Sequence, residues 1–279
     1  MNYELALIFI FGGLGLSASV IYFLFSRYKQ DKLHKLQNMP FKDEYRKILL
    51  KIPQYKNLSS EDKEKLERSI LIFVYTKEFI GVDLEIINEM KIVIGFYACL
   101  LLLHIETKNC YENLSTIIVY PSAVMTTKKS YIGGIYSKEK LLIDGQSSND
   151  TVVLIWDDIK QEIIHPRHSN VIVHEFAHEI DFMDGEIDGI PPLEKSKYNE
   201  WTHIIFKDFR ELRKIILENK DLAKYKLIGN YAATNEAEFF AVISERFFES
   251  PHSFKVKFPE LYNELKKFYK IDTIELTKG

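Results

Sequence analysis

The segment of residues 170–185, NVIVHEFAHEIDFMDG, constrains the fold more than any other part of the chain. His174 and His178 stand four residues apart, and Glu175 directly follows the first histidine. Positions i and i+4 of a helix lie on one face, and the apolar residues around them predict that this helix is buried. Buried imidazoles and carboxylates need partners. The chain must therefore fold around an internal polar site, filled either by a metal ion or by hydrogen bonds within the core.

This H-E-x-x-H spacing has a specific chemical use in zinc peptidases. Two neutral imidazoles, here His174 and His178, leave a cation its positive charge, so that the ion lowers the pKa of water toward neutrality. The adjacent carboxylate of Glu175 can take a proton from that water and return it to a leaving amine. We therefore predict a zinc metallopeptidase with His174 and His178 as metal ligands and Glu175 as the general base.

The third protein ligand has to come from a distant part of the chain. A metzincin would have another histidine shortly after the second one, but residues 180–184 read IDFMD. His203 and His252 remain candidates, and a carboxylate on a later helix would complete a site of two histidines and one glutamate. The segment of residues 231–249, YAATNEAEFFAVISERFFE, offers four such carboxylates among apolar residues: Glu236, Glu238, Glu245 and Glu249.

Helical spacing narrows this choice but does not complete it. Glu238 and Glu245 are seven residues apart and share one helix face, whereas Glu236 and Glu249 are predicted to be solvated. Thr234 or Asn235 can cap the amino-terminal end of this helix. The residues alone do not decide between Glu238 and Glu245.

The remaining patterns predict an α+β fold, a mostly helical zincin-like domain with a small β-sheet. Apolar residues at helical spacing or on all sides of a segment indicate helices, and β-branched runs that stop at turn residues indicate strands. The expected helices cover residues 41–52, 60–79, 85–103, 194–217, 235–249 and 259–270. The expected strands cover residues 115–120 and 151–156, with a third strand between them.

Residues 5–25, LALIFIFGGLGLSASVIYFLF, hold no charge and are long enough to cross the hydrocarbon core. A cleavable signal peptide fits less well because no basic residue precedes the run, and a buried core helix of this length would be unusual. Arg27, Lys29, Lys32 and Lys35 follow the run, so the positive-inside rule places the rest of the chain in the cytoplasm.

These features divide the chain into three predicted parts. Residues 1–26 form a single transmembrane anchor, residues 27–40 a basic juxtamembrane linker, and residues 41–279 the zinc metallopeptidase domain, facing the cytoplasm. The chain has 37 Lys and Arg against 40 Asp and Glu, a net charge of −3. This balance excludes a globally basic nucleic-acid footprint, and we expect no nucleic-acid partner.

Two long segments resemble the Mlc titration factor A family of zinc-dependent peptidases. They are HEFAHEIDFMDGEIDGIPPL and YAATNEAEFFAVISERFFESP. Similarity also extends through FKDEYRKILLKIPQYKNLS, the helix ending ACLLLL, IIVYPSAV and VVLIWDDI, so it covers Phe41 to about Tyr269. The run NEAEFFAV is also similar to the metal-binding helix of the lethal-factor-type toxin proteases.

The resemblance implies specific roles for Glu238, Tyr231 and Glu245, and the position of Asp181, three residues after His178, indicates a role for it too. Glu238, the glutamate before the paired phenylalanines, would be the third ligand of one Zn²⁺ per chain, and Tyr231 would donate a hydrogen bond to the developing oxyanion. Glu245 would then either contact one of the metal-binding residues or form a buried pair with a nearby cationic side chain. Asp181 would orient an imidazole or cap the helix end.

The resemblance also implies the reaction and its partners. It implies hydrolysis of a peptide or protein substrate, including aminopeptidase-type cleavage, and by analogy a transcriptional repressor of sugar uptake as a partner. The alternative hypothesis is a zinc-containing regulatory protein that sequesters such a repressor and has only vestigial peptidase activity. A fourth protein ligand on the zinc, such as His203 or Glu245, would favour that alternative.

Overall fold

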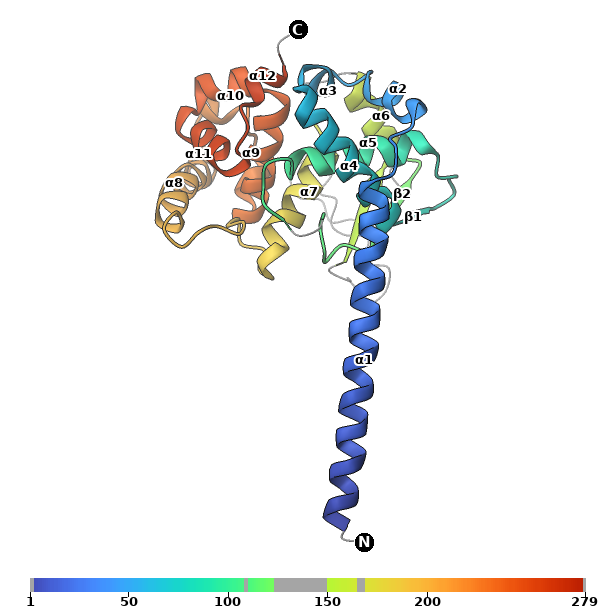
Figure 1. Cartoon of the computed structure of the whole chain (residues 1–279). Coiled ribbons are helices and arrows are strands. Elements are labelled where there is room, and N and C mark those ends of the chain that lie inside the picture. Colours follow the sequence, from blue (N-terminus) through green and yellow to red (C-terminus); the bar gives the residue numbers. More distant parts are fainter. Residues whose placement is uncertain (1–2, 108–109, 123–149, 165–168, 278–279) are drawn as a thin grey trace.

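The structure is a computed structural model that describes residues 3–107, 110–122, 150–164 and 169–277, apart from the side chains of residues 4–10, 12, 29 and 164. The helices are α1 (Tyr3–Gln37), α2 (Asp43–Leu49), α3 (Pro53–Asn57), α4 (Ser60–Thr76), α5 (Asn88–Leu101), α6 (Trp156–Ile164), α7 (Val171–Asp181), α8 (Tyr198–Leu217), α9 (Glu236–Glu249), α10 (Pro251–Lys257), α11 (Pro259–Tyr269) and α12 (Thr273–Leu276). The strands are β1 (Glu78–Gly81), β2 (Thr116–Tyr120) and β3 (Thr151–Ile155), and short 3-10 helices are η1 (Phe182–Asp184), η2 (Ala223–Tyr225) and η3 (Tyr231–Ala233). Figure 1 shows α1 projecting from the body of the molecule, where α7 lies between the strands and the group α8–α11.

Among the described residues, the sheet has three parallel strands in the order β1-β2-β3. Glu78 pairs with Thr116, and Thr116 pairs with Thr151. The strands predicted at 115–120 and 151–156 are confirmed to within a residue at each end. The prediction that one helix continues to about residue 79 is wrong, because α4 ends at Thr76 and the chain continues as β1. The strand expected between β2 and β3 falls largely outside the described residues.

The change from α4 to β1 has a local cause at Lys77. This residue has extended backbone angles, φ −97° and ψ 145°. Its ammonium group donates hydrogen bonds to the carbonyl oxygens of Tyr111 and Leu114, in the segment that leads into β2. These bonds hold the chain beside β2 directly after the helix, so residues 78–81 pair as a strand instead of forming another helical turn.

The core packs around the predicted apolar helix and the H-E-x-x-H helix. Helix α5 is buried along almost its whole length, as its apolar residues on every side predict. Phe176 of α7 is fully buried between Phe73 of α4 and Tyr111, with ring centroids 5.6 and 4.9 Å away. Such edge-to-face aromatic contacts are favourable beyond the area that they bury. They fix α7 against the sheet side of the molecule.

The predicted transmembrane anchor is wrong. In the part of the chain that the structure describes, no helix combines the length and the apolar character needed to cross a bilayer. The predicted membrane attachment through residues 5–25 and the single-pass, cytoplasm-facing location are corrected with it.

Candidate metal centre

Helix α7 presents the H-E-x-x-H residues on its less buried side. The side chain of Asn170 accepts a hydrogen bond from the backbone N–H of Val173 at 3.1 Å, so the helix begins with a capped amino-terminal end. The apolar residues Ile172, Val173, Phe176, Ala177 and Ile180 are buried. His174, Glu175 and His178 are half-buried and face the opposite way. The helix thus carries a core face and a polar face, as its spacing predicts.

Helix α9 brings the distant carboxylate to this polar face. Asn235 caps α9 by accepting a hydrogen bond from the backbone N–H of Glu238 at 2.8 Å, which sets Glu238 in the first helical turn. Oε2 of Glu238 lies 3.2 Å from Nε2 of His174 and 3.4 Å from Nε2 of His178. The structure therefore brings together two residues of one helix and one residue some 60 positions later.

These three side chains form a cluster compatible with a metal site. One ligand atom from each of His174, His178 and Glu238 lies within 4.8 Å of the others. Two imidazole nitrogens and one carboxylate oxygen are a ligand set that zinc enzymes use with one position left open. His203 and His252 do not belong to the cluster, and Glu238 rather than Glu245 supplies its carboxylate.

The electrostatics of the cluster favour positive charge between the two helices. Burial opposes ionisation of Glu238, but hydrogen bonds with His174 and His178 hold the pKa of its carboxyl well below the usual value. Burial also opposes the charged form of His174 and would lower its pKa. Hydrogen bonds with Glu238 and Glu245 act in the opposite direction and raise this pKa to about 10. Charges that stabilise a proton on an imidazole would also stabilise a divalent cation held among the same groups.

Tyr231 and Glu175 lie at the same site. Tyr231 is in η3, and its ring centroid is 6.0 Å from that of His174. Burial, followed by the charge of Glu238 and a hydrogen bond with it, raises the pKa of the Tyr231 phenol, so the hydroxyl stays protonated at neutral pH. The charge of Glu175 adds to the raised pKa of both His174 and Tyr231.

Two glutamates further along α9 are buried behind the cluster. Oε2 of Glu245 lies 3.6 Å from Nδ1 of His174. Glu249 was predicted to be solvated, which is wrong, because it is only 2% exposed. Its carboxylate accepts a hydrogen bond from the side chain of Asn170 at 2.8 Å. The role of Asn170 was also missed, although an asparagine directly before an apolar helical run is a recognisable cap signal.

Asp181 fastens the loop that follows α7. It is completely buried, its Oδ2 accepts a hydrogen bond from the backbone N–H of Gly189 at 2.9 Å, and burial raises the pKa of its carboxyl to about 6. The carbonyl of Gly189 accepts a hydrogen bond from the indole of Trp201 at 3.0 Å. The bond to Gly189 matches neither predicted role of Asp181, because it neither caps the end of α7 nor contacts an imidazole.

We expect Gly189→Ala to destabilise the protein and to disturb the start of α9. Gly189 has a φ of +78°, and an added Cβ would lie 2.5 Å from the carbonyl oxygen of Glu236. A left-handed conformation and an overpacked contact together cost roughly 2–4 kcal/mol. Urea unfolding measures this loss.

Gly229→Ala is the matched control for this substitution. Gly229 has a similar φ of +85°, but its Cβ would meet nothing within 4 Å. It should lose only the conformational part, about 1–2 kcal/mol. Equal losses in both variants would show that the close approach to Glu236 is unimportant.

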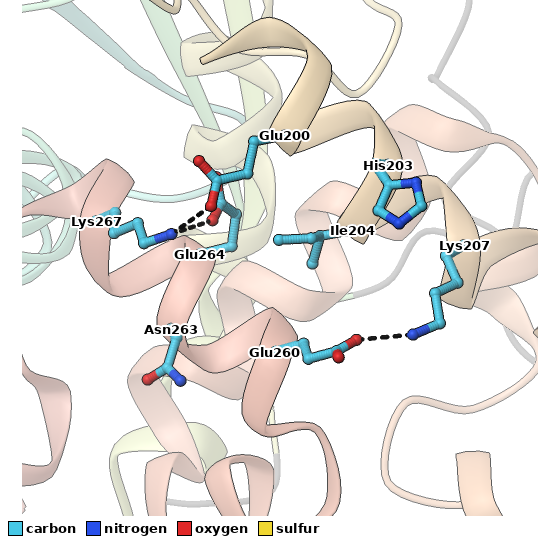
Figure 2. Close-up of a pocket in the computed structure, with 8 residues that line it drawn as sticks. All are labelled: Glu200, His203, Ile204, Lys207, Glu260, Asn263, Glu264 and Lys267. Carbon is cyan, nitrogen blue, oxygen red and sulfur yellow. Dashed lines mark hydrogen bonds and ion pairs between the residues drawn. The ribbon is translucent and has the colours of Figure 1, made fainter.

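A hollow of about 470 Å³ between α8 and α11 lies apart from the metal cluster (Figure 2). Its charged residues pair with one another. Lys207 contacts Glu260 at 2.8 Å, and Lys267 contacts Glu200 at 2.7 Å. His203 lines this hollow instead of joining the metal cluster. Both lysines of the hollow are paired with glutamates, and none of its residues belongs to the cluster on α7 and α9.

Comparison with known proteins finds a family model and relatives that match most of the chain. A family model described as glucose-regulated metallo-peptidase M90 matches residues 25–270. An uncharacterized protein of Synechocystis sp. is 33% identical over 230 residues, which cover 80% of this chain and 82% of that protein. Mlc titration factor A of Klebsiella pneumoniae is 29% identical over 232 residues, covering 81% and 85% of the two chains. Mlc titration factor A of Salmonella arizonae is 29% identical over 231 residues, covering 80% and 89%.

Proposed function

The chain belongs to the glucose-regulated metallo-peptidase M90 family, together with the proteins named Mlc titration factor A, and on this basis we propose that it is a zinc-dependent enzyme that hydrolyses peptide bonds. The family predicted from the sequence is confirmed. The family match gives the chain a metallopeptidase-type domain, and we propose residues 41–279 as the catalytic unit.

One observation carries the proposal. Nitrogen atoms of His174 and His178 and an oxygen of Glu238 lie within 4.8 Å of one another on two packed helices. With three protein ligands, a zinc ion keeps a position for water or substrate, whereas four protein ligands would close the site. Glu245 faces the far nitrogen of His174, at 3.6 Å from Nδ1, rather than the Nε2 side where Glu238 lies. This arrangement supports a catalytic ion over a structural one.

The side chains in and around the cluster would have separate roles in the reaction. When bound, zinc would supply Lewis-acid chemistry, lowering the pKa of water and polarising a carbonyl group. His174, His178 and Glu238 would hold the ion. Glu175 would take the proton from the attacking water and give it to the leaving amine. Tyr231, protonated at neutral pH, would donate a hydrogen bond to the oxygen on which negative charge develops.

Metal removal tests this function. We expect the full chain to cleave members of a peptide library, to lose at least about tenfold in rate on treatment with a chelator, and to recover when Zn²⁺ is returned. Cleavage that persists in protein shown to be free of metal would contradict the proposal. Comparing library peptides that have free and acetylated amino termini then tests aminopeptidase-type cleavage, which would require the free terminus.

A second candidate function comes from the name of the relatives. Proteins named Mlc titration factor A match about four-fifths of this chain. The corresponding hypothesis is that this chain binds a transcriptional repressor and has little peptidase activity. Calorimetry of the zinc-loaded chain with a purified repressor of the Mlc type tests for binding, and the library experiment decides independently whether the chain is also a peptidase.

A further inference from the structure

We propose that Glu245 is a positioning residue that fixes the orientation and the protonated nitrogen of His174. The inference rests on the proposed function, since it concerns how a zinc ligand is prepared. It assigns Glu245 to a histidine ligand, whereas the sequence left its role open between a ligand contact and a cation pair. Both interactions occur, one on each oxygen of the carboxylate.

His174 lies between two carboxylates of the same helix. Oε2 of Glu238 is 3.2 Å from Nε2, and Oε2 of Glu245 is 3.6 Å from Nδ1. Residues seven apart lie on one face of a helix, two turns from each other. Helix α9 therefore approaches both ring nitrogens of His174. Glu238, which belongs to the metal cluster, faces Nε2, and Glu245, which does not, faces Nδ1.

Glu245 is itself held in place by other bonds. It is only 6% exposed. Its Oε1 accepts hydrogen bonds from the backbone N–H of Asn170 at 3.3 Å and from the guanidinium of Arg246 at 3.0 Å. These bonds occupy one oxygen and leave the other directed at His174. Since Asn170 is the cap residue of α7, the carboxylate also links the start of that helix to α9.

This arrangement has a defined chemical consequence for the ring. When a metal is bound, a carboxylate facing Nδ1 would keep the proton on that nitrogen and leave the lone pair of Nε2 for the ion. The negative charge also makes the imidazole a more basic ligand. His178 lacks such support in the described part of the chain, because its Nδ1 is buried without a hydrogen-bond partner there. His174 should therefore be the better fixed of the two histidines.

The test compares Glu245→Gln with Glu249→Gln in the full chain. Both substitutions remove one buried negative charge from α9 near Asn170, and in the described part of the chain Glu245 is the one of the two that lies beside His174. Zinc affinity is measured by competition with a chromophoric chelator. Loss of an outer carboxylate partner typically weakens metal binding about 10–100-fold, which we expect for Glu245→Gln, against less than about threefold for Glu249→Gln. Equal effects of the two substitutions would overturn the inference.

A spectroscopic measurement on the unmodified chain gives a second, independent test. Nitrogen-15 NMR of the zinc-loaded protein should show the His174 ring protonated at Nδ1 with Nε2 on the metal, and the opposite assignment would overturn the inference even if neither variant folds. The proposed function fails separately: it fails if the unmodified chain binds no zinc or cleaves no peptide. The inference fails if zinc binds normally and Glu245 proves no more important than Glu249.

Discussion

Glu175→Gln is expected to remove most peptide hydrolysis while leaving the metal centre loaded. The substitution keeps the size and shape of the side chain but removes the carboxylate that takes a proton from water. General-base catalysis contributes about 10²–10⁴-fold to such reactions, so kcat on the best library peptide should fall by that factor. Because Glu175 does not belong to the His174–His178–Glu238 cluster, zinc content measured by atomic absorption should stay at one ion per chain.

Glu179→Gln is the matched control for this experiment. Glu179 is one helical turn after Glu175 on α7 and is also half-buried, so the same substitution there tests the loss of a carboxylate from this helix. We expect less than about a threefold change in kcat, because no proton transfer is assigned to it. Unchanged hydrolysis in Glu175→Gln would rule out the proposed general base. Loss of zinc in that variant would mean that Glu175 binds the metal.

The parts of the site that the sequence predicted well are those set by local spacing. His174, Glu175 and His178 share a short helix, so helical geometry alone brings them to one face. Asn170 and Asn235 begin α7 and α9 through cap hydrogen bonds that involve residues three positions away. Such short-range interactions can be recognised without a structure, although Asn170 was overlooked.

The parts that the sequence could not settle depend on how distant segments pack. Physical arguments left Glu238 and Glu245 equivalent, since both lie on one face of α9. Only the contact between α7 and α9 shows that one approaches Nε2 and the other Nδ1 of His174. Glu249 was misjudged for the same reason. Its buried carboxylate accepts a hydrogen bond from Asn170, 79 positions away in the sequence.

The remaining differences between the prediction and the structure concern two segments whose composition is compatible with more than one structure. Residues 78–81 continue an apolar helical pattern, but the hydrogen bonds of Lys77 to the segment before β2 make them a strand. The uncharged run at residues 5–25 predicted a membrane anchor by length and lack of charge alone. In the part of the chain that the structure describes, no helix is both long and apolar enough to cross a membrane.

Glu238→Gln is expected to abolish both zinc binding and hydrolysis at ordinary metal concentrations. Glu238 is the only carboxylate of the three-residue cluster, and its ionised form contacts both His174 and His178. A neutral amide cannot supply the negative charge that opposes the cation. Removing a direct ligand should cost more than the roughly 10–100-fold that loss of an outer partner costs. Chelator competition measures the affinity, and peptide hydrolysis at saturating Zn²⁺ measures what activity the added metal restores.

Glu236→Gln separates this effect from a general disturbance of α9. Glu236 lies in the same first helical turn but outside the metal cluster. Its substitution should change zinc affinity by less than about threefold. If both variants bind zinc like the unmodified chain, Glu238 is not a ligand and the cluster is only an internal hydrogen-bonded network. If Glu238→Gln alone loses zinc while far-UV circular dichroism shows that it is folded, α9 supplies the third ligand. His174 and His178 of α7 are then the other two protein ligands of a working metal site.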